Sequence, residues 1–306
     1  KRLGLLLVRE KRHDEALTAV RRALRHSRQS AVLWRLALAL SEGAPDVVGA
    51  AVRACPDDPD VWLAHLVTSL RRNVKTRALM RLVKSAAGPH RFSTETLTRA
   101  GVHLLKAGEG KAASVLADAI EARDDELVAA KTFVLLCRVQ RNDRKAAIDA
   151  ALSAIKIAPD PAPFYRVLVR LRGDEELDSA AMVQALEYLR ERYPSEAEWS
   201  ERLGWAYFQR GDTERSVRLF RDVFRSRRLK DVKLRSLLMA AESARQAGNT
   251  KDAIRVLEAA YGLYPRRVSI LNNLIYTLAQ DGGDIQRARE LLPKLLDLAP
   301  EETFAV

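Results

Sequence analysis

The sequence predicts an all-α fold, a right-handed solenoid of about nine stacked helical hairpins. Apolar residues recur at helical spacing along the 306 residues, and glycine followed by Asp or Asn separates successive helical segments. Residues of one kind also recur 35 positions apart, as Ala253 and Ala288 do, and Leu257 and Leu292 share this spacing. A fixed period of this length indicates repeated supersecondary units that stack on one another.

Composition favours a folded chain without membrane insertion. Apolar residues make up 47% of the sequence and charged residues 30%, and no apolar run approaches the roughly 18 residues that a membrane span needs. The sequence starts with Lys1 rather than methionine, while helical periodicity is already present, so we expect a fragment of a longer chain. Cys55 and Cys137 are isolated, which leaves the compartment open between cytoplasm and periplasm.

Taken in chain order, regular and irregular stretches alternate. Regular helical periodicity covers 1–28, and an irregular joint is predicted at 41–60, because Trp34 and Trp62 lie only 28 residues apart. There the segment from Glu42 to Asp46 is expected to interrupt a short second helix. A hairpin at 60–88 and regular repeats over 93–159 follow, and 160–194 is predicted to be a second irregular joint. Each joint is either a degenerate repeat or a bend in the superhelix.

The most regular repeats are predicted at 199–300. Each hairpin there has a glycine-containing turn, at Gly211-Asp212, Gly248-Asn249 and Gly282-Gly283-Asp284. Proline cannot continue a helix from inside it, so prolines after the second helices are expected to close them, at Pro194, Pro265 and Pro300. Pro293 lies inside the last predicted helix and is expected to kink it.

Within each repeat, small residues stand where two helices must approach and large residues where a neighbouring hairpin leaves a hole. The three best copies contain Leu203, Gly204, Tyr207, Ser216, Phe220 and Val223; then Ala241, Ala244, Ala253, Leu257, Ala260 and Pro265; then Leu274, Ile275, Leu278, Ala288, Leu292, Leu295 and Pro300. In these positions the chain resembles the bacterial tetratricopeptide-repeat (TPR) family. The resemblance implies a superhelix of hairpins that acts as a non-catalytic scaffold for binding other proteins.

The sequence does not predict an enzyme. The five histidines form no pair at i, i+4 with flanking ligands, and there is no nucleophile elbow of the Gly-x-Ser-x-Gly type. We therefore expect no catalytic residue, no metal site and no cofactor.

The resemblance implies a binding groove on the concave face, lined by the first helix of each hairpin. Counted from the matched repeat positions, the expected partner-binding residues are Arg202, Trp205, Phe208, Arg235, Glu242, Arg245, Asn272, Asn273 and Tyr276. Aromatic and Arg side chains supply rigid contact area, and Asn can pair with both groups of a peptide backbone. An alternative stays open, in which Trp205 and Phe208 pack against the next hairpin and the asparagines brace neighbouring backbone.

The charge distribution suggests a second kind of surface. The net charge is +12, and residues 61–94 contain seven Lys or Arg and no acid, whereas 174–201 contain nine acids and two arginines. Two basic helix stripes are predicted, one at Arg218, Arg221, Arg225 and Arg228, the other at Arg77, Arg81 and Lys84. Such stripes are either solvated outer faces or a surface for an acidic protein, a nucleic acid or an anionic polysaccharide.

Overall fold

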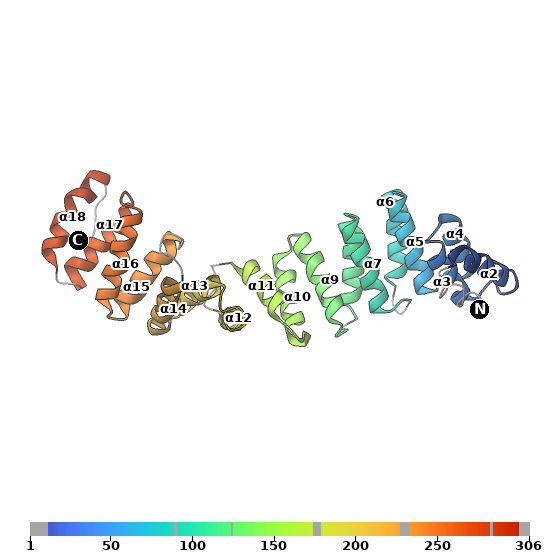
Figure 1. The fold of residues 1–306 in the computed structure, drawn as a ribbon, viewed down its shortest axis with the longest axis horizontal. Helices are drawn as coiled ribbons and strands as arrows, with labels where there is room; N and C mark the ends of the chain where they lie inside the picture. Colours follow the sequence, from blue (N-terminus) through green and yellow to red (C-terminus); the bar gives the residue numbers. More distant parts are fainter. Residues whose placement is uncertain are drawn as a thin grey trace. The chain divides into compact units, whose positions relative to one another are not determined.

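A computed structural model describes residues 12–88, 91–123, 125–173, 179–226, 233–281 and 284–299 (Figure 1). Over these ranges the chain forms helices joined by short turns, and it forms no β-strand. The all-α prediction is therefore confirmed. The chain divides into two compact units, unit 1 (Lys1–Pro159) and unit 2 (Asp160–Val306).

Within its described residues, unit 1 contains the helix α2 followed by four helical hairpins. The first helices of these hairpins are α3 (Ala31–Leu40), α5 (Pro59–Arg71), α7 (Thr94–Lys106) and α9 (Val128–Gln140). The helix α2 spans His13–His26. The second helices of the hairpins are α4 (Pro45–Ala54), α6 (Thr76–Ala86), α8 (Gly110–Glu121) and α10 (Arg144–Ile157). Most helices contact the next one in the chain, α6 contacts α8, and first helices of successive hairpins also contact one another, as α5 does with α7 and α7 with α9. This is the nearest-neighbour stacking of a helical-repeat solenoid.

The described part of unit 2 contains four more hairpins. Their first helices are α11 (Ala162–Arg172), α13 (Ala197–Gln209), α15 (Leu234–Gln246) and α17 (Val268–Tyr276), which runs into the π-helical turn η2 (Thr277–Asp281). Their second helices are α12 (Ala180–Arg192), α14 (Thr213–Ser226), α16 (Thr250–Leu263) and α18 (Ile285–Leu298). The predicted joint at 160–194 thus contains an ordinary pair of helices, α11 and α12.

The predicted repeat positions form the core. Leu203, Ser216, Phe220, Ala253 and Ala260 are all buried, and the equivalent positions of the other hairpins in the described part of the chain are buried or half-buried. Small residues are needed at the positions where two helices approach each other closely. A Cβ atom added at Gly101 would lie 2.1 Å from Cζ of Phe133, so only glycine leaves room for this buried ring between α7 and α9.

The predicted turns and helix ends are confirmed where the structure describes them. Gly211 and Gly248 have φ angles of 77° and 72°, in the left-handed region, and each follows a first helix. The Asp212 carboxylate accepts a hydrogen bond from the backbone N–H of Arg215 at 3.1 Å and so caps α14. Pro194 and Pro265 each follow the end of a second helix by two residues. Gly282, Gly283 and Pro300 lie outside the described residues.

One local prediction is wrong. The segment from Glu42 to Asp46 does not interrupt a second helix, because it contains the turn between two separate helices, α3 and α4. Glu42 and Gly43 both have positive φ angles, of 50° and 74°, and the chain reverses there. The short repeat spacing arises because α3 and α4 have only 10 residues each.

Candidate binding surfaces

The first helices of unit 2 carry the predicted groove residues, and two of these residues stack on each other. The guanidinium carbon of Arg235, on α15, lies 4.0 Å from the centre of the Trp205 ring, on α13. Trp205 is only 6% exposed, whereas Arg235 is exposed. The Trp205 ring therefore lies beneath the exposed guanidinium of Arg235, which belongs to the next hairpin.

A second group of predicted residues meets between α15 and α17. The carboxylate of Glu242 accepts hydrogen bonds of 2.8 and 2.9 Å from Arg245, and the Arg245 guanidinium also lies 5.7 Å from the centre of the Tyr276 ring. The hydrogen bonds from Arg245 hold the pKa of Glu242 below its ordinary value, against an opposing effect of burial. The Tyr276 side chain is 39% exposed, so an aromatic surface held by a paired Arg faces solvent here.

The remaining predicted groove residues occupy the same helices with less contact among themselves. Arg202 forms an ion pair of 3.1 Å with Glu198 along α13. Phe208 and Asn272 are half-buried, and Asn273 is exposed. The structure thus brings together Trp205 with Arg235, and Glu242 with Arg245 and Tyr276.

Buried polar contacts, which the sequence pattern did not predict, lie beneath this face. The hydroxyl of Ser236 donates a hydrogen bond to the carboxylate of Glu201, and both residues are buried. The hydroxyls of Ser216 and Ser243, both fully buried, lie 2.8 Å apart, and that of Ser216 also donates to the carbonyl of Gly204 at 2.8 Å. Serine at an alanine position is the one signal in the sequence that could have indicated this polar joint.

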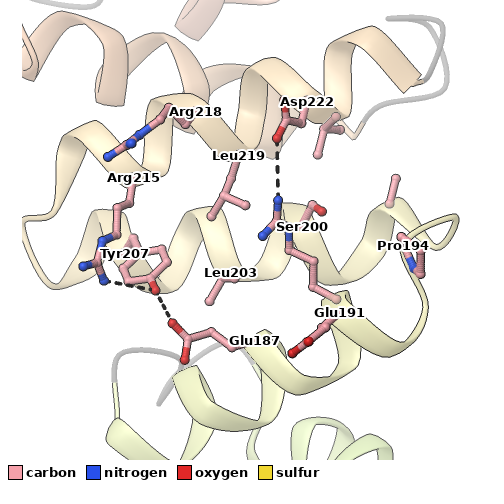
Figure 2. A pocket seen from close by; sticks show the side chains of 13 residues that line it. Glu187, Glu191, Pro194, Ser200, Leu203, Tyr207, Arg215, Arg218, Leu219 and Asp222 are labelled. Atoms are coloured by element: carbon pink, nitrogen blue, oxygen red, sulfur yellow. Dashed lines mark hydrogen bonds and ion pairs between the residues drawn. The ribbon is translucent and has the colours of Figure 1, made fainter.

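A cleft of about 830 Å³ opens on the opposite side of unit 2, between the second helices α12 and α14 and above α13 (Figure 2). The hydroxyl of Tyr207 lies in it, donating to Glu187 and accepting a 3.3 Å hydrogen bond from Arg215. Burial, followed by the contact with Glu187, raises the pKa of Tyr207. Arg190 and Asp222 form an ion pair of 3.7 Å across the cleft.

The basic stripe predicted on α14 faces these outer clefts and is partly neutralised. Arg221 forms a 2.8 Å ion pair with Asp252 of α16, across a second cleft of about 550 Å³. Arg218 is exposed and lies 3.9 Å from Glu214. The side chain of Arg225 and the whole of Arg228 lie outside the described part of the structure. The second predicted stripe, Arg77, Arg81 and Lys84, is exposed along α6 of unit 1.

Neither a cluster of metal-ligating side chains nor a membrane-spanning helix occurs among the described residues. No group of three or more His, Cys, Asp or Glu side chains there is placed to hold a metal ion. Within the same ranges, no helix has both the length and the apolar content that crossing a membrane requires.

Comparison with known proteins gives a family match in the second half of the chain. A family model described as tetratricopeptide repeat matches residues 178–226 and 238–303. A search of curated protein sequences gave no match.

Several solved structures have a similar arrangement. The crystal structure of the MamA protein is 16% identical, with 58% of this chain and 97% of that chain covered, at a TM-score of 0.48. PilF of Pseudomonas aeruginosa is 15% identical, with 68% of this chain and 93% of that chain covered, at a TM-score of 0.42. YrrB, described as a TPR protein with an unusual peptide-binding site, is 13% identical, with 72% of this chain and 93% of that chain covered, at a TM-score of 0.31.

Stacked hairpins with small residues at their contacts define a helical-repeat protein of the all-α class. Residues 178–226 and 238–303, which contain α12, α13, α14, α16, α17 and α18 in full and most of α15, are similar to the tetratricopeptide-repeat family. Proteins of this family generally serve as scaffolds for protein interactions.

Proposed function

We propose that the protein is a non-catalytic scaffold that binds a segment of a partner protein on the first-helix face of unit 2. The observation that carries the proposal is the pair of Arg–aromatic contacts on this face, Arg235 over Trp205 and Arg245 beside Tyr276. Trp, Tyr and Arg are the residues that most often dominate the energy of protein interfaces.

The helical scaffold favours such binding because its surface is ordered before the partner arrives. The first helices α13 and α15 each pack against the second helix of their own hairpin and against each other, so little conformational entropy is lost on the scaffold side. Asn272 and Asn273 lie on α17 beside Tyr276, and their amides can pair with the backbone of an extended segment. A partner with both a carboxylate and an apolar side chain would match the cations and rings on this face.

A second candidate function is binding of a nucleic acid or anionic polysaccharide through the basic stripe of α6. The three exposed cations Arg77, Arg81 and Lys84 support it. The stripe of α14 supports it less, because Arg221 already forms an ion pair with Asp252.

A peptide library displayed on phage and selected on the intact chain would test the proposal. Selected peptides should bind the unaltered protein with an affinity that changes little between low and physiological salt. We expect Tyr276→Ala and Arg235→Ala each to weaken binding about tenfold, which corresponds to about 1.4 kcal/mol. Arg255→Ala, an exposed change on the second helix α16, is the matched control and should leave the affinity unchanged.

The same measurements separate the two candidate functions. Steep loss of binding with salt, together with loss in a variant that reverses Arg77, Arg81 and Lys84, would contradict the peptide proposal and support a polyanion partner.

A further inference from the structure

A further cleft lies in unit 1, between the helices α2 and α4. Its volume of about 660 Å³ is within the range of small-molecule binding sites. The helix α3, which contacts both α2 and α4, contributes Trp34 and Ala37 to its wall. The charged residues that line it are four arginines and one acid, namely Arg21, Arg25, Arg28, Arg53 and Asp46. We call this space the arginine cleft.

The charges of the arginine cleft are unevenly distributed along it. At one end, Arg21 lies 3.8 Å from Asp46, which is in the first turn of α4. At the other end, Arg25 lies in the last turn of α2 and Arg53 in the last turn of α4, and Arg28 follows α2 by two residues. Within the described part of the chain, no carboxylate forms an ion pair with these last three arginines. The cleft therefore has a neutralised end and a cationic end.

Two hydrogen bonds fix the backbone at the cationic end. The thiol of Cys55, the residue that ends α4, donates to the backbone carbonyl of Gln29 at 3.4 Å, so the end of α4 lies beside the turn that follows α2. The indole N–H of Trp34, on α3, donates to the carbonyl of Arg28 at 2.6 Å. The backbone that carries the arginines is thus held in place before a ligand arrives, which lowers the entropic cost of binding.

The acids nearest to this end in the sequence are paired elsewhere. Asp57 forms an ion pair of 3.1 Å with Arg91, and Asp58 forms one of 2.6 Å with Arg35. Neither carboxylate pairs with an arginine of the cleft, so the cationic end keeps its positive charge.

Most of the remaining lining is apolar. Leu24, Ala37 and Val47 line the cleft and are buried core residues. Ala50 and Ala54 of α4 are half-buried and have short side chains, which leaves the space between the two helices open. An apolar surface beside unpaired cations suits a ligand with an anionic group at one end and an apolar body.

The number of guanidinium groups indicates which anion fits. A carboxylate has one negative charge and two oxygens, which the fork of a single Arg can satisfy. A phosphodiester of a nucleic acid likewise carries one charge per phosphate. A phosphate monoester carries a charge of about −1.5 to −2 at pH 7 and offers three acceptor oxygens. Three arginines from two helices and a turn match the monoester best.

We propose that the arginine cleft binds a phosphate monoester of an apolar small molecule. The phosphate lies among Arg25, Arg28 and Arg53, and the apolar body lies on Leu24 and Val47. The site is within unit 1 and shares no residue with the first-helix face of unit 2, so it does not depend on the function proposed above.

The probes are phenyl phosphate, 2-naphthyl phosphate and octyl phosphate, and calorimetric titration measures their binding to the intact chain. At least one ester should bind about tenfold or more tightly than inorganic phosphate, because only the ester has an apolar body. It should also bind about tenfold or more tightly than the carboxylate with the same body, because a carboxylate satisfies fewer guanidinium groups. If no ester binds, or if none exceeds inorganic phosphate, the proposal is overturned.

Substitutions locate the bound phosphate. Arg25→Gln and Arg53→Gln, made singly, should each weaken ester binding about tenfold or more. Both should keep the helical circular dichroism, because the two side chains are exposed. The matched control is Arg22→Gln, which removes the same charge from an exposed position of α2 outside the cleft and should bind like the unaltered protein. Equal affinities of the Arg22→Gln and Arg25→Gln variants would contradict the proposed site.

A third change locates the apolar body. Ala50→Leu fills part of the space between α2 and α4 and should reduce the affinity for the ester to that for inorganic phosphate. An unchanged preference for the ester in this variant would mean that the body binds elsewhere, and the proposal would fail.

Larger anions are the competing occupants, and displacement of the bound ester distinguishes them. The competitors are a glutamate-rich peptide, oligothymidylate, and vesicles that contain phosphatidate, which carries a phosphate monoester on a membrane. At equal concentrations of anionic groups, none should displace the ester. Displacement by one of them that is lost in the Arg25→Gln variant would assign the cleft to that macromolecule or membrane and overturn the proposal.

Discussion

Replacement of Gly101 by alanine tests how closely α7 and α9 approach. The new Cβ would lie 2.1, 2.4 and 2.7 Å from three ring atoms of Phe133, whose side chain is only 1% exposed and cannot swing into solvent. Overpacking a rigid core costs about 1–3 kcal/mol, and contacts this short call for the upper end. Alanine also recovers about 1 kcal/mol of helix propensity. We therefore expect Gly101→Ala to lower the free energy of unfolding by about 2 kcal/mol.

Two other glycines make a matched series. At Gly204 the added Cβ would lie 3.1 Å from the nearest ring atom of Phe220, so the gain in propensity and the milder clash should nearly cancel. At Gly49, inside α4, the nearest atom is the end of the flexible Arg53 side chain at 3.7 Å, so Gly49→Ala should stabilise the protein by up to about 1 kcal/mol.

Urea unfolding followed by circular dichroism at 222 nm would measure the stability of the three variants. The unfolding midpoints should be compared, because repeat arrays need not unfold in a single step. Phe133→Leu removes the ring atoms in question, so the double variant with Gly101→Ala should be more stable than the sum of the two single effects predicts. A Gly101→Ala midpoint equal to or above that of Gly49→Ala would refute the close packing of α7 against α9.

Two further predictions concern titratable groups of unit 1. Burial raises the pKa of Asp58, but the hydrogen bonds from Arg35 and from two backbone N–H groups outweigh it and hold that pKa below its ordinary value. Asp58 therefore stabilises the fold at pH values above its unfolded-state pKa of about 4. Asp58→Asn should lower the urea midpoint at pH 7, and the difference from the unaltered protein should shrink as the pH falls toward 3. A difference that stays constant with pH would contradict the role of the ionised carboxylate. Burial raises the pKa of Cys137 to about 11, so at pH 8 a thiol reagent should modify it only as fast as the protein unfolds. The half-buried Cys55 should be modified first. Modification of both thiols at the same rate would contradict the packing of α9.

The repeat architecture could be predicted from sequence because its signals are local. Gly211 and Asp212 specify a turn and a cap within a few residues, and the small residue at position 253 recurs at the same phase 35 residues later. These features depend on backbone conformation and on packing within one hairpin. They do not require knowledge of how one hairpin is rotated against the next.

Contacts between hairpins were much harder to predict. Arg221 and Asp252 are 31 residues apart, and nothing in the basic pattern of α14 indicates that one of its arginines pairs with α16. The burial of Trp205 under Arg235 likewise depends on the angle between α13 and α15. The angle between neighbouring helices determines which groups a long charged side chain can reach. A periodic sequence pattern does not specify this angle.

The buried polar contacts between the hairpins α13/α14 and α15/α16, Ser236 with Glu201 and Ser216 with Ser243, limit how this protein can be rebuilt. Joints lined by alanine present only shape, so a designer can duplicate, delete or exchange the hairpins beside them. A hairpin moved to or from this joint would leave the buried Glu201 carboxylate of α13 without the Ser236 hydroxyl of α15 that donates to it, at a cost of about 1–3 kcal/mol. The hairpins α13/α14 and α15/α16 therefore form one module that shuffling experiments should keep together.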